Sequence, residues 1–349
     1  MPDCPSGNPA SRRSFLKALA AGTAYAGLVP RALARNEPSK RGRIDVHHHM
    51  MPPFQPNARI TWTPDDSLRV MERYGTETAI LSFVVPAEFV YDGSEKARSL
   101  ARRANEYGAK LVSEHPRQFG FFAMLPLREP EASLKEIEYC FETLRCDGIV
   151  LLTNAGDKWP GDPLFAPIFE ELNRRRSAVF IHPSTPNCCR NLVGGVPDYV
   201  VEYDFDTTRA VVSLLFSGTL AHCPDIHWIV NHSGAALPTL AGRIKDRVPG
   251  DAANFKAHAD GKNEQMPSGA YYELKRLFYE CAHATYPMPM AALRAFAPST
   301  QFLFGTDFPV EAYETTVDQF QELKLPTDVQ YALDRGNAER IWPRLHKSP

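Results

Sequence analysis

The sequence lacks most of the short signatures that identify a binding function directly. Its 349 residues contain no C-x-x-C pair, so neither a zinc ribbon nor a thioredoxin-type redox site is indicated. No G-x-G-x-x-G segment and no Walker loop follows the early apolar runs, which argues against a nucleotide-binding sheet. The 39 basic and 41 acidic residues leave a net charge of −2, which provides no basic surface for a phosphate backbone. We therefore expect no nucleic-acid partner.

Long apolar runs are also absent after residue 34. None approaches the roughly 20 apolar residues that span a bilayer, so no stable membrane insertion is expected. The first 34 residues instead look like a twin-arginine export signal, in which Arg12-Arg13 precedes a weakly hydrophobic run and Ala32-Leu33-Ala34 fits a cleavage site. This pattern predicts a periplasmic protein whose mature chain is a single domain over residues 35–349. A frayed N-terminal helix and a retained anchor are the alternatives.

Removal of the signal changes the charge balance, because the signal holds four basic residues and one acid. The remaining 315 residues carry 35 basic and 40 acidic side chains, a net charge of −5. Six cysteines remain, and we expect free thiols, because a chain of this length buries its core without cross-links. A bridge between the adjacent Cys188 and Cys189 is the strained alternative.

What the sequence does contain is a regular alternation of short apolar runs and amphipathic helical stretches. Eight runs predict strands, at 44–47, 78–83, 119–123, 148–152, 178–182, 226–230, 276–281 and 301–305. The predicted helices that follow them are 65–74, 95–114, 130–144, 164–176, 207–221, 235–248, 288–296 and further helices to the C-terminus. The polar segment 249–271 is expected to be a long loop.

Continuous apolar strands that alternate with helices indicate a parallel sheet covered by helices. Eight such units in about 300 residues predict an α/β protein that closes into a (β/α)8 barrel of the TIM type. An open, doubly wound sheet is the alternative, but the sequence has none of the phosphate-binding loops typical of that fold.

Polar residues stand at the predicted carboxyl ends of the strands, where barrel enzymes carry their chemistry. Because side chains alternate along a strand, His47 and His49 are expected to point toward the barrel axis and His48 away from it. Five inward-facing groups are expected to converge at one mouth: His47, His49, His182, His232 and Asp307. Such nitrogen and carboxylate ligands suit zinc, with manganese or iron as alternatives. Isolated histidines are expected to be hydrogen-bonded structural residues: His115, His227 and His283.

Taken together, these motifs resemble the amidohydrolase superfamily and, within it, the branch named for aminocarboxymuconate-semialdehyde decarboxylase. The resemblance covers nearly all of the mature chain and includes the segments 44–49, 147–151, 180–183, 205–243 and 304–309. It implies that one divalent metal ion, Zn²⁺ or alternatively Mn²⁺, is held by four protein ligands: His47, His49, His182 and Asp307. Strand four lacks the carboxylated lysine of binuclear relatives, which favours one metal over two.

The resemblance also implies roles for two residues outside the ligand set. His232 would act as an acid/base beside the metal. Arg243 matches an arginine that reaches a neighbouring subunit's site in some relatives and binds the substrate carboxylate there, which predicts a homodimer. A surface or interface ion pair is the alternative for Arg243.

Three segments depart from the decarboxylase pattern. Ser184 follows His182-Pro183 where the best-known decarboxylases carry tryptophan, and Glu280 stands near the end of strand seven where relatives often have aspartate. The usual His-x-Gly-Gly motif reads His232-Ser233-Gly234-Ala235. These changes leave the metal ligands intact and leave the substrate open.

Two reactions are compatible with these ligands. The first is non-oxidative decarboxylation of an aromatic or unsaturated carboxylic acid, with the metal as Lewis acid and His232 or Asp307 as the source of the proton that replaces carbon dioxide. The alternative is hydrolysis of a lactone, ester or amide by an activated water. The branch resemblance favours decarboxylation. Five convergent titratable groups argue against a binding protein without turnover.

Overall fold

The computed structural model describes residues 42–55, 60–85, 89, 91–156, 158–247 and 262–346. The chain divides into a unit at Met1–Glu37 and a unit at Pro38–Pro349, and the fold below is that of the second. The predicted export signal lies outside the described residues and stays a prediction. Among the described helices, none combines the length and the apolar character that a membrane crossing requires.

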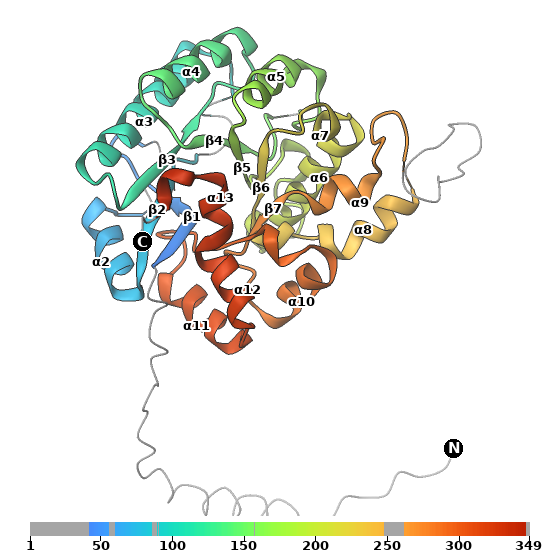
Figure 1. The fold of residues 1–349 in the computed structure, drawn as a ribbon. Helices are drawn as coiled ribbons and strands as arrows, with labels where there is room; N and C mark the ends of the chain where they lie inside the picture. Colours follow the sequence, from blue (N-terminus) through green and yellow to red (C-terminus); the bar gives the residue numbers. More distant parts are fainter. Residues whose placement is uncertain are drawn as a thin grey trace, which may run out of the picture. The chain divides into compact units, whose positions relative to one another are not determined.

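Eight parallel strands follow one another around a single sheet in chain order (Figure 1). They are β1 (Arg43–His49), β2 (Thr76–Ser82), β3 (Phe119–Met124), β4 (Gly148–Leu152), β5 (Ala178–His182), β6 (His227–Val230), β7 (Phe278–Glu280) and β8 (Phe302–Leu303). The sheet closes because β1 also bonds to the segment after β8. The Val46 amide donates to the Phe304 carbonyl at 2.9 Å, and the His49 amide donates to the Phe308 carbonyl at 2.7 Å. The predicted barrel is thereby confirmed.

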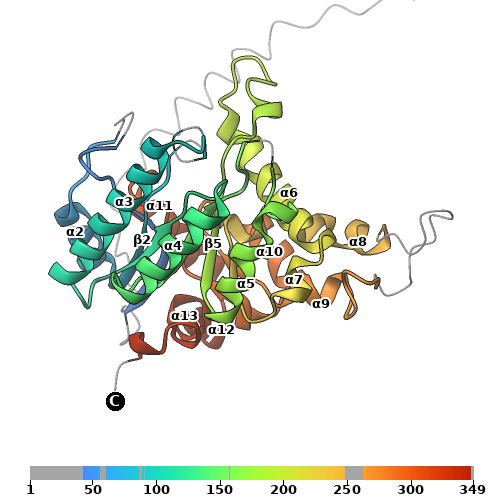
Figure 2. The same ribbon diagram turned by 90° about the horizontal axis from the view of Figure 1, so that it is seen from above.

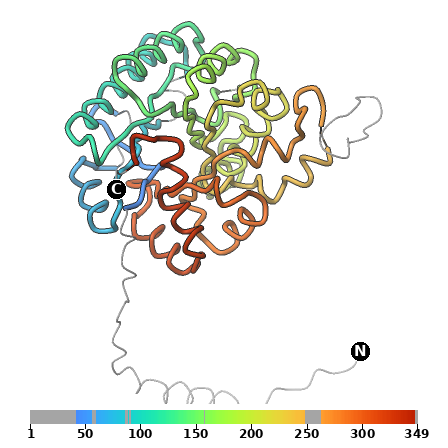
Figure 3. Tube along the Cα trace, viewed as in Figure 1, coloured from blue at the N-terminus to red at the C-terminus, as the bar shows by residue number. Residues whose placement is uncertain are grey.

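Helices surround the strands, as the ribbon and the tube both show (Figures 1 and 3). They are α2 (Pro64–Tyr74), α3 (Glu95–Glu114), α4 (Pro130–Glu142), α5 (Ala166–Arg174), α6 (Glu202–Phe216), α7 (Thr219–His222), α8 (Leu237–Asp246), α9 (Ala270–Lys275), α10 (Pro287–Phe296), α11 (Tyr313–Leu323), α12 (Thr327–Tyr331) and α13 (Asn337–Ile341). Most bounds agree with the predicted ranges to within a few residues.

Two predicted segments differ from the structure. The expected helix at 207–221 begins earlier, at Glu202, where Glu202 and Asp204 place negative charge in the first turn and complement the helix dipole. It also divides at Gly218, whose φ of 82° interrupts the helix between α6 and α7. The predicted loop at 249–271 ends two residues early, because α9 begins at Ala270, and residues 249–261 lie outside the described part of the chain.

The core explains why these strands are continuous apolar runs rather than alternating ones. Every residue of β3, β4 and β5 is buried, with one face in the barrel interior and the other under the helices. At the amino ends of the strands the buried Arg335 ties the chain together. Its guanidinium donates to the Gly42 and Leu345 carbonyls, at 2.7 and 2.8 Å, and pairs with Glu339. These contacts join the start of β1 to the C-terminal segment, at the end of the barrel opposite the one where such folds carry their chemistry.

Candidate active site

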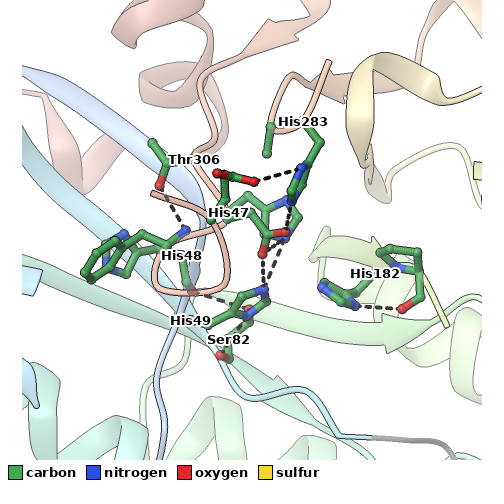
Figure 4. Close-up of polar contacts among 12 residues, drawn as sticks. His47, His48, His49, Ser82, His182, His283 and Thr306 are labelled. Carbon is green, nitrogen blue, oxygen red and sulfur yellow. Dashed lines mark hydrogen bonds and ion pairs between the residues drawn. The ribbon is translucent and has the colours of Figure 1, made fainter. Parts of the chain in front are cut away.

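The three consecutive histidines of β1 divide as the strand alternation predicts. His47 and His49 point into the barrel mouth, and their Nε2 atoms lie 3.2 Å apart. His48 points away from them (Figure 4) and places its Nδ1 3.0 Å from Asp45 and its Nε2 2.7 Å from the Ser67 hydroxyl. All three side chains are fully buried, so their different surroundings come from the strand geometry and not from exposure.

Each inward-facing imidazole has its Nδ1 against an oxygen. The partner of His47 is the Glu280 carboxylate at 2.8 Å. His49 faces Ser82, with the hydroxyl at 2.8 Å and the carbonyl at 3.3 Å, and His182 faces the Pro183 carbonyl at 2.9 Å. Carbonyl and carboxylate oxygens only accept, so the contacts of His47 and His182 place a ring proton on Nδ1, whereas the Ser82 hydroxyl beside His49 can accept or donate. Contacts of this kind orient metal-ligating histidines in proteins.

The carboxylate of Asp307 meets these rings. Its Oδ1 lies 3.2 Å from Nε2 of His47 and 2.7 Å from Nε2 of His49. That oxygen is buried and accepts no hydrogen bond in the described part of the chain. One ligand atom from each of His47, His49, His182 and Asp307 lies within 4.8 Å of the others. Three imidazole nitrogens and a carboxylate oxygen that face one another at this spacing fit a divalent cation bound by nitrogen and oxygen.

The electrostatics of the cluster favour a cation. Burial lowers the pKa of His47, but the Glu280 and Asp307 carboxylates outweigh burial and raise that pKa to about 10. Burial would raise the pKa of Asp307, yet His47 and His283 hold it well below its ordinary range. Two ionised, buried carboxylates therefore produce a strongly negative potential at the mouth, which a positive charge must balance.

His232 lies beside the four ligands at the end of β6. Its ring stacks on that of His47, with centroids 5.7 Å apart, and its Nδ1 lies 3.3 Å from Asp204. Its backbone amide donates to Glu280 at 2.8 Å. The Nε2 atom is buried and has no hydrogen-bond partner among the described residues. His232 is therefore held from two sides while Nε2 stays available to a reacting group.

The backbone around His232 is strained. Four consecutive residues, His232–Ala235, adopt positive φ values between 51° and 82°. Gly234 is required there, because a Cβ at that position would lie 2.8 Å from the Tyr279 ring. The Ala235 of the altered motif adopts a conformation that glycine tolerates better. Such conformations persist at functional sites, where the surrounding structure holds them in place.

The sequence reasoning missed three residues of this cluster. Glu280 ends β7 and joins the Nδ1 of His47 to the backbone of His232. His283, expected to be an isolated structural residue, places its Nε2 2.6 Å from the second oxygen of Asp307. Asp204 reaches His232 from α6. Glu280 carried a usable signal, since it is an acid at the carboxyl end of a predicted strand, whereas the loop of His283 and the helix of Asp204 carried none.

Arg243 is the one predicted site residue that the structure does not bring to the cluster. It lies exposed near the end of α8 and has no hydrogen bond or ion pair within the described residues. A role in this chain's own site therefore has no support in the geometry, and the predicted role in a neighbouring subunit's site stays a prediction.

Comparison with known proteins identifies the family. The amidohydrolase family profile matches residues 44–344. The chain belongs to the amidohydrolase family. It is 36% identical over 336 residues to the decarboxylase YanB of Aspergillus niger, which covers 87% of this chain and 88% of the relative. It is 32% identical to the 6-methylsalicylic acid decarboxylase of Penicillium expansum, with 87% and 97% covered.

Relatives of the predicted branch and solved structures agree with this assignment. The 2-amino-3-carboxymuconate-6-semialdehyde decarboxylase of Dictyostelium discoideum is 32% identical over 53% of this chain and 51% of its own length. The predicted branch is thereby confirmed. Among solved structures, a 2,6-dihydroxybenzoate decarboxylase superposes with a TM-score of 0.76 at 22% identity and covers 87% of this chain and 99% of that one. At this identity the superposition establishes the fold.

Proposed function

We propose that this protein is a metal-dependent, non-oxidative decarboxylase of an aromatic acid that carries a hydroxyl group beside its carboxylate. The observation that carries the proposal is the convergence of His47, His49, His182 and Asp307, each imidazole with Nδ1 bonded to an oxygen. The names of the relatives bear out the expected reaction type and suggest the substrate class, since 6-methylsalicylic and 2,6-dihydroxybenzoic acids both have this hydroxyl group.

The donor set leads us to propose one Zn²⁺ ion, with Mn²⁺ as the competing choice. Three nitrogens and one carboxylate suit zinc. A related decarboxylase from Polaromonas, at 21% identity, has been solved with manganese and an inhibitor. When bound, the ion supplies a Lewis acid for the hydroxyl and carboxylate oxygens of the substrate.

The protein's own residues must hold the ring and deliver a proton. When the bond between ring and carboxylate breaks, its electron pair stays on the ring carbon, which then takes up a proton. The Oδ2 atom of Asp307 lies 2.6 Å from His283, and its Oδ1 faces the Nε2 atoms of His47 and His49, whereas the buried Nε2 of His232 has no hydrogen-bond partner among the described residues. We therefore assign the proton first to His232, with Asp204 orienting its ring, and Asp307 remains the competing donor.

We further propose that the enzyme acts as a homodimer in which Arg243 binds the substrate carboxylate in the partner's site. Two observations support this arrangement. Arg243 is exposed and has no partner in its own described chain, and large apolar side chains are exposed between β5 and α6 and after β7, including Tyr199, Val200 and Met288. Mixing the purified Arg243→Ala and His232→Ala variants tests whether Arg243 acts in the partner subunit's site. Reassembled mixtures should regain activity that neither variant has alone, and failure to regain any would contradict it.

Export by the twin-arginine route to the periplasm is proposed on the N-terminal sequence alone. Fractionation of cells that express the wild type and an Arg12→Lys/Arg13→Lys variant tests it. The wild type should be found in the periplasm, and the variant should stay in the cytoplasm.

The proposed reaction is tested by carbon dioxide release from a panel of salicylate-type acids. Release should be abolished by a chelator, restored by Zn²⁺ or Mn²⁺, and absent from His182→Ala. Metal analysis of the purified protein should find about one ion per chain. Turnover of lactones or aryl esters without carbon dioxide release would overturn the proposal in favour of hydrolysis.

A further inference from the structure

The connection between β5 and α6 carries a pair of adjacent thiols that the proposed reaction does not use. It begins directly after His182 and runs to Glu202. Cys188 and Cys189 lie in its first helical turn, Asn187–Cys189. In Figure 2 the connection rises above β5 and α6, and several of its apolar side chains are exposed: Leu192, Val193, Val196, Tyr199 and Val200.

The two thiols are placed differently although they are neighbours in sequence. Their Sγ atoms approach to 2.6 Å. Cys188 is exposed, the only one of the six described cysteines to be so, whereas Cys189 is 8% exposed. A reagent from solvent therefore reaches Cys188 first, and Cys189 lies within reach of any sulfur adduct that forms on it.

The surroundings of Cys189 keep its proton in place. Its hydrogen bond to Cys188 raises the pKa of the Cys189 thiol to about 11, against the opposing effect of the Arg209 guanidinium. Arg209 in turn lies 3.3 Å from Glu202 and 3.6 Å from Asp206. The pair thus consists of an exposed outer sulfur and a buried inner thiol in direct contact.

The residues at the two ends of the connection form hydrogen bonds near the mouth of the barrel. After His182, the Ser184 hydroxyl accepts from Asn154 at 2.8 Å. At the other end, Asp206 accepts from the same Asn154 at 2.7 Å, and Asp204 lies against His232. A change in the backbone at Cys188–Cys189 therefore acts on a segment whose ends both contact the candidate active site.

We propose that Cys188 and Cys189 form a redox-active dithiol, which a low-molecular-weight disulfide oxidises to a vicinal disulfide, and that ring closure shifts the connection that leads into the first turn of α6, where Asp204 lies. In the first step Cys188 loses its proton to solvent and attacks one sulfur of the reagent, and a thiolate leaves. In the second step Cys189 loses its proton, attacks the Cys188 sulfur, and expels the second thiolate. Two protein thiols are oxidised, and the reagent is reduced to two thiols.

The geometry of adjacent residues explains why this bond would be reversible and why it would move the backbone. Neighbouring Cα atoms are about 3.8 Å apart across a trans peptide, less than the roughly 4.4–6.8 Å that disulfides prefer. Closure of the ring must therefore distort the turn Asn187–Cys189. A strained disulfide is also easily reduced.

The chemistry is tested on the full chain with oxidised glutathione, followed by alkylation and trypsin digestion. Both cysteines fall in one tryptic peptide, residues 177–190, so a vicinal disulfide makes this single peptide two hydrogens lighter and resistant to alkylation. A reductant should reverse the change. Cys189→Ser should retain glutathione on Cys188, Cys188→Ser should retain none, and the control Cys146→Ser should behave as the wild type.

Three other outcomes would contradict the proposed redox-active dithiol. These are an unmodified peptide, a persistent glutathione adduct on the wild type, or a cross-link to a different peptide. Movement of the connection is read by limited proteolysis, with a several-fold change in cleavage after Arg190 in the wild type and none in Cys188→Ser. This readout needs no enzymatic turnover.

Oxidation should also cause a reversible, several-fold loss of carbon dioxide release, an expectation that rests on the proposed function. If the reduced enzyme is active and oxidation leaves that activity unchanged, the link between disulfide formation and the active site is wrong, whereas the dithiol chemistry stands.

Discussion

The strands that carry the proposed metal ligands and the β5–α6 connection are built in opposite ways. The proposed metal ligands His47, His49 and His182 stand on strands, are buried, and each has its Nδ1 bonded to an oxygen. The β5–α6 connection is irregular, exposes apolar side chains such as Tyr199, and holds an exposed thiol. The comparison teaches that the scaffold fixes the kind of chemistry, while loops leave the substrate and its regulation free to vary.

The largest expected effect distinguishes two neighbouring residues of β1. His49→Ala removes a ligand atom, and we expect metal content and carbon dioxide release to fall by at least about 100-fold, beyond the loss typical of a residue that only supports a ligand. His48→Gln is the matched control, because His48 bonds to Asp45 and Ser67 on the opposite side of the strand. The His48→Gln variant should bind metal as the wild type does, and its free energy of unfolding should be lower by about 1–3 kcal/mol. Equal metal loss in both variants would contradict the assignment.

A smaller effect is expected at Glu280, which contacts His47 but is not itself a proposed metal ligand. Glu280→Gln removes the negative charge that faces His47 Nδ1 while it retains the size of the side chain. Metal affinity should fall by about 10–100-fold, as for other partners of ligating histidines. Titration of the metal-free protein measures it. Circular dichroism should show an unchanged fold, and an unchanged affinity would mean that Glu280 does not orient His47.

The convergence of polar groups at one mouth was accessible to sequence reasoning because it follows from strand geometry, whereas the choice of four of them as metal ligands came from the family resemblance. A buried parallel strand is an uninterrupted apolar run, so the polar residue that ends it is conspicuous, as His182 is after Ala178–Ile181. The alternation of side chains then separates His48 from His47 and His49. Knowing which strand ends meet required only the rule that active sites of such barrels form at one face.

The sequence did not predict the remaining residues of the site, because their positions depend on turns and on where a helix begins. His283 follows β7 in a loop and adopts a φ of 54°, a conformation that no apolar pattern signals. Asp204 stands on the first turn of α6, ahead of the predicted start of that helix. The role of Gly305 also became visible only in three dimensions. A Cβ there would overlap the Glu280 carboxylate and the Cβ of His47.

A moderate effect is expected at His283, which contacts Asp307 and the ring of His232. Its Nε2 binds the second oxygen of Asp307, so the first oxygen faces the other ligands. His283→Asn preserves the left-handed backbone that asparagine tolerates, but it shortens the side chain. We expect about a tenfold loss of metal affinity, at the lower bound for a ligand's partner, with an unchanged melting temperature. A loss of kcat at full metal affinity would instead make His283 a group that acts on the substrate.

The smallest effect on stability is expected in the β5–α6 connection. Val193 is 52% exposed, so Val193→Ser should change the free energy of unfolding by no more than about 0.5 kcal/mol. Val150→Ser in β4 is the matched control, and at 2% exposure it should cost about 2 kcal/mol or more. Denaturant unfolding measures both. If the connection borders the substrate, Val193→Ser should nevertheless alter the ratio of kcat/KM between small and bulky salicylates by a few-fold. An unchanged ratio would confine substrate selection to the buried part of the mouth.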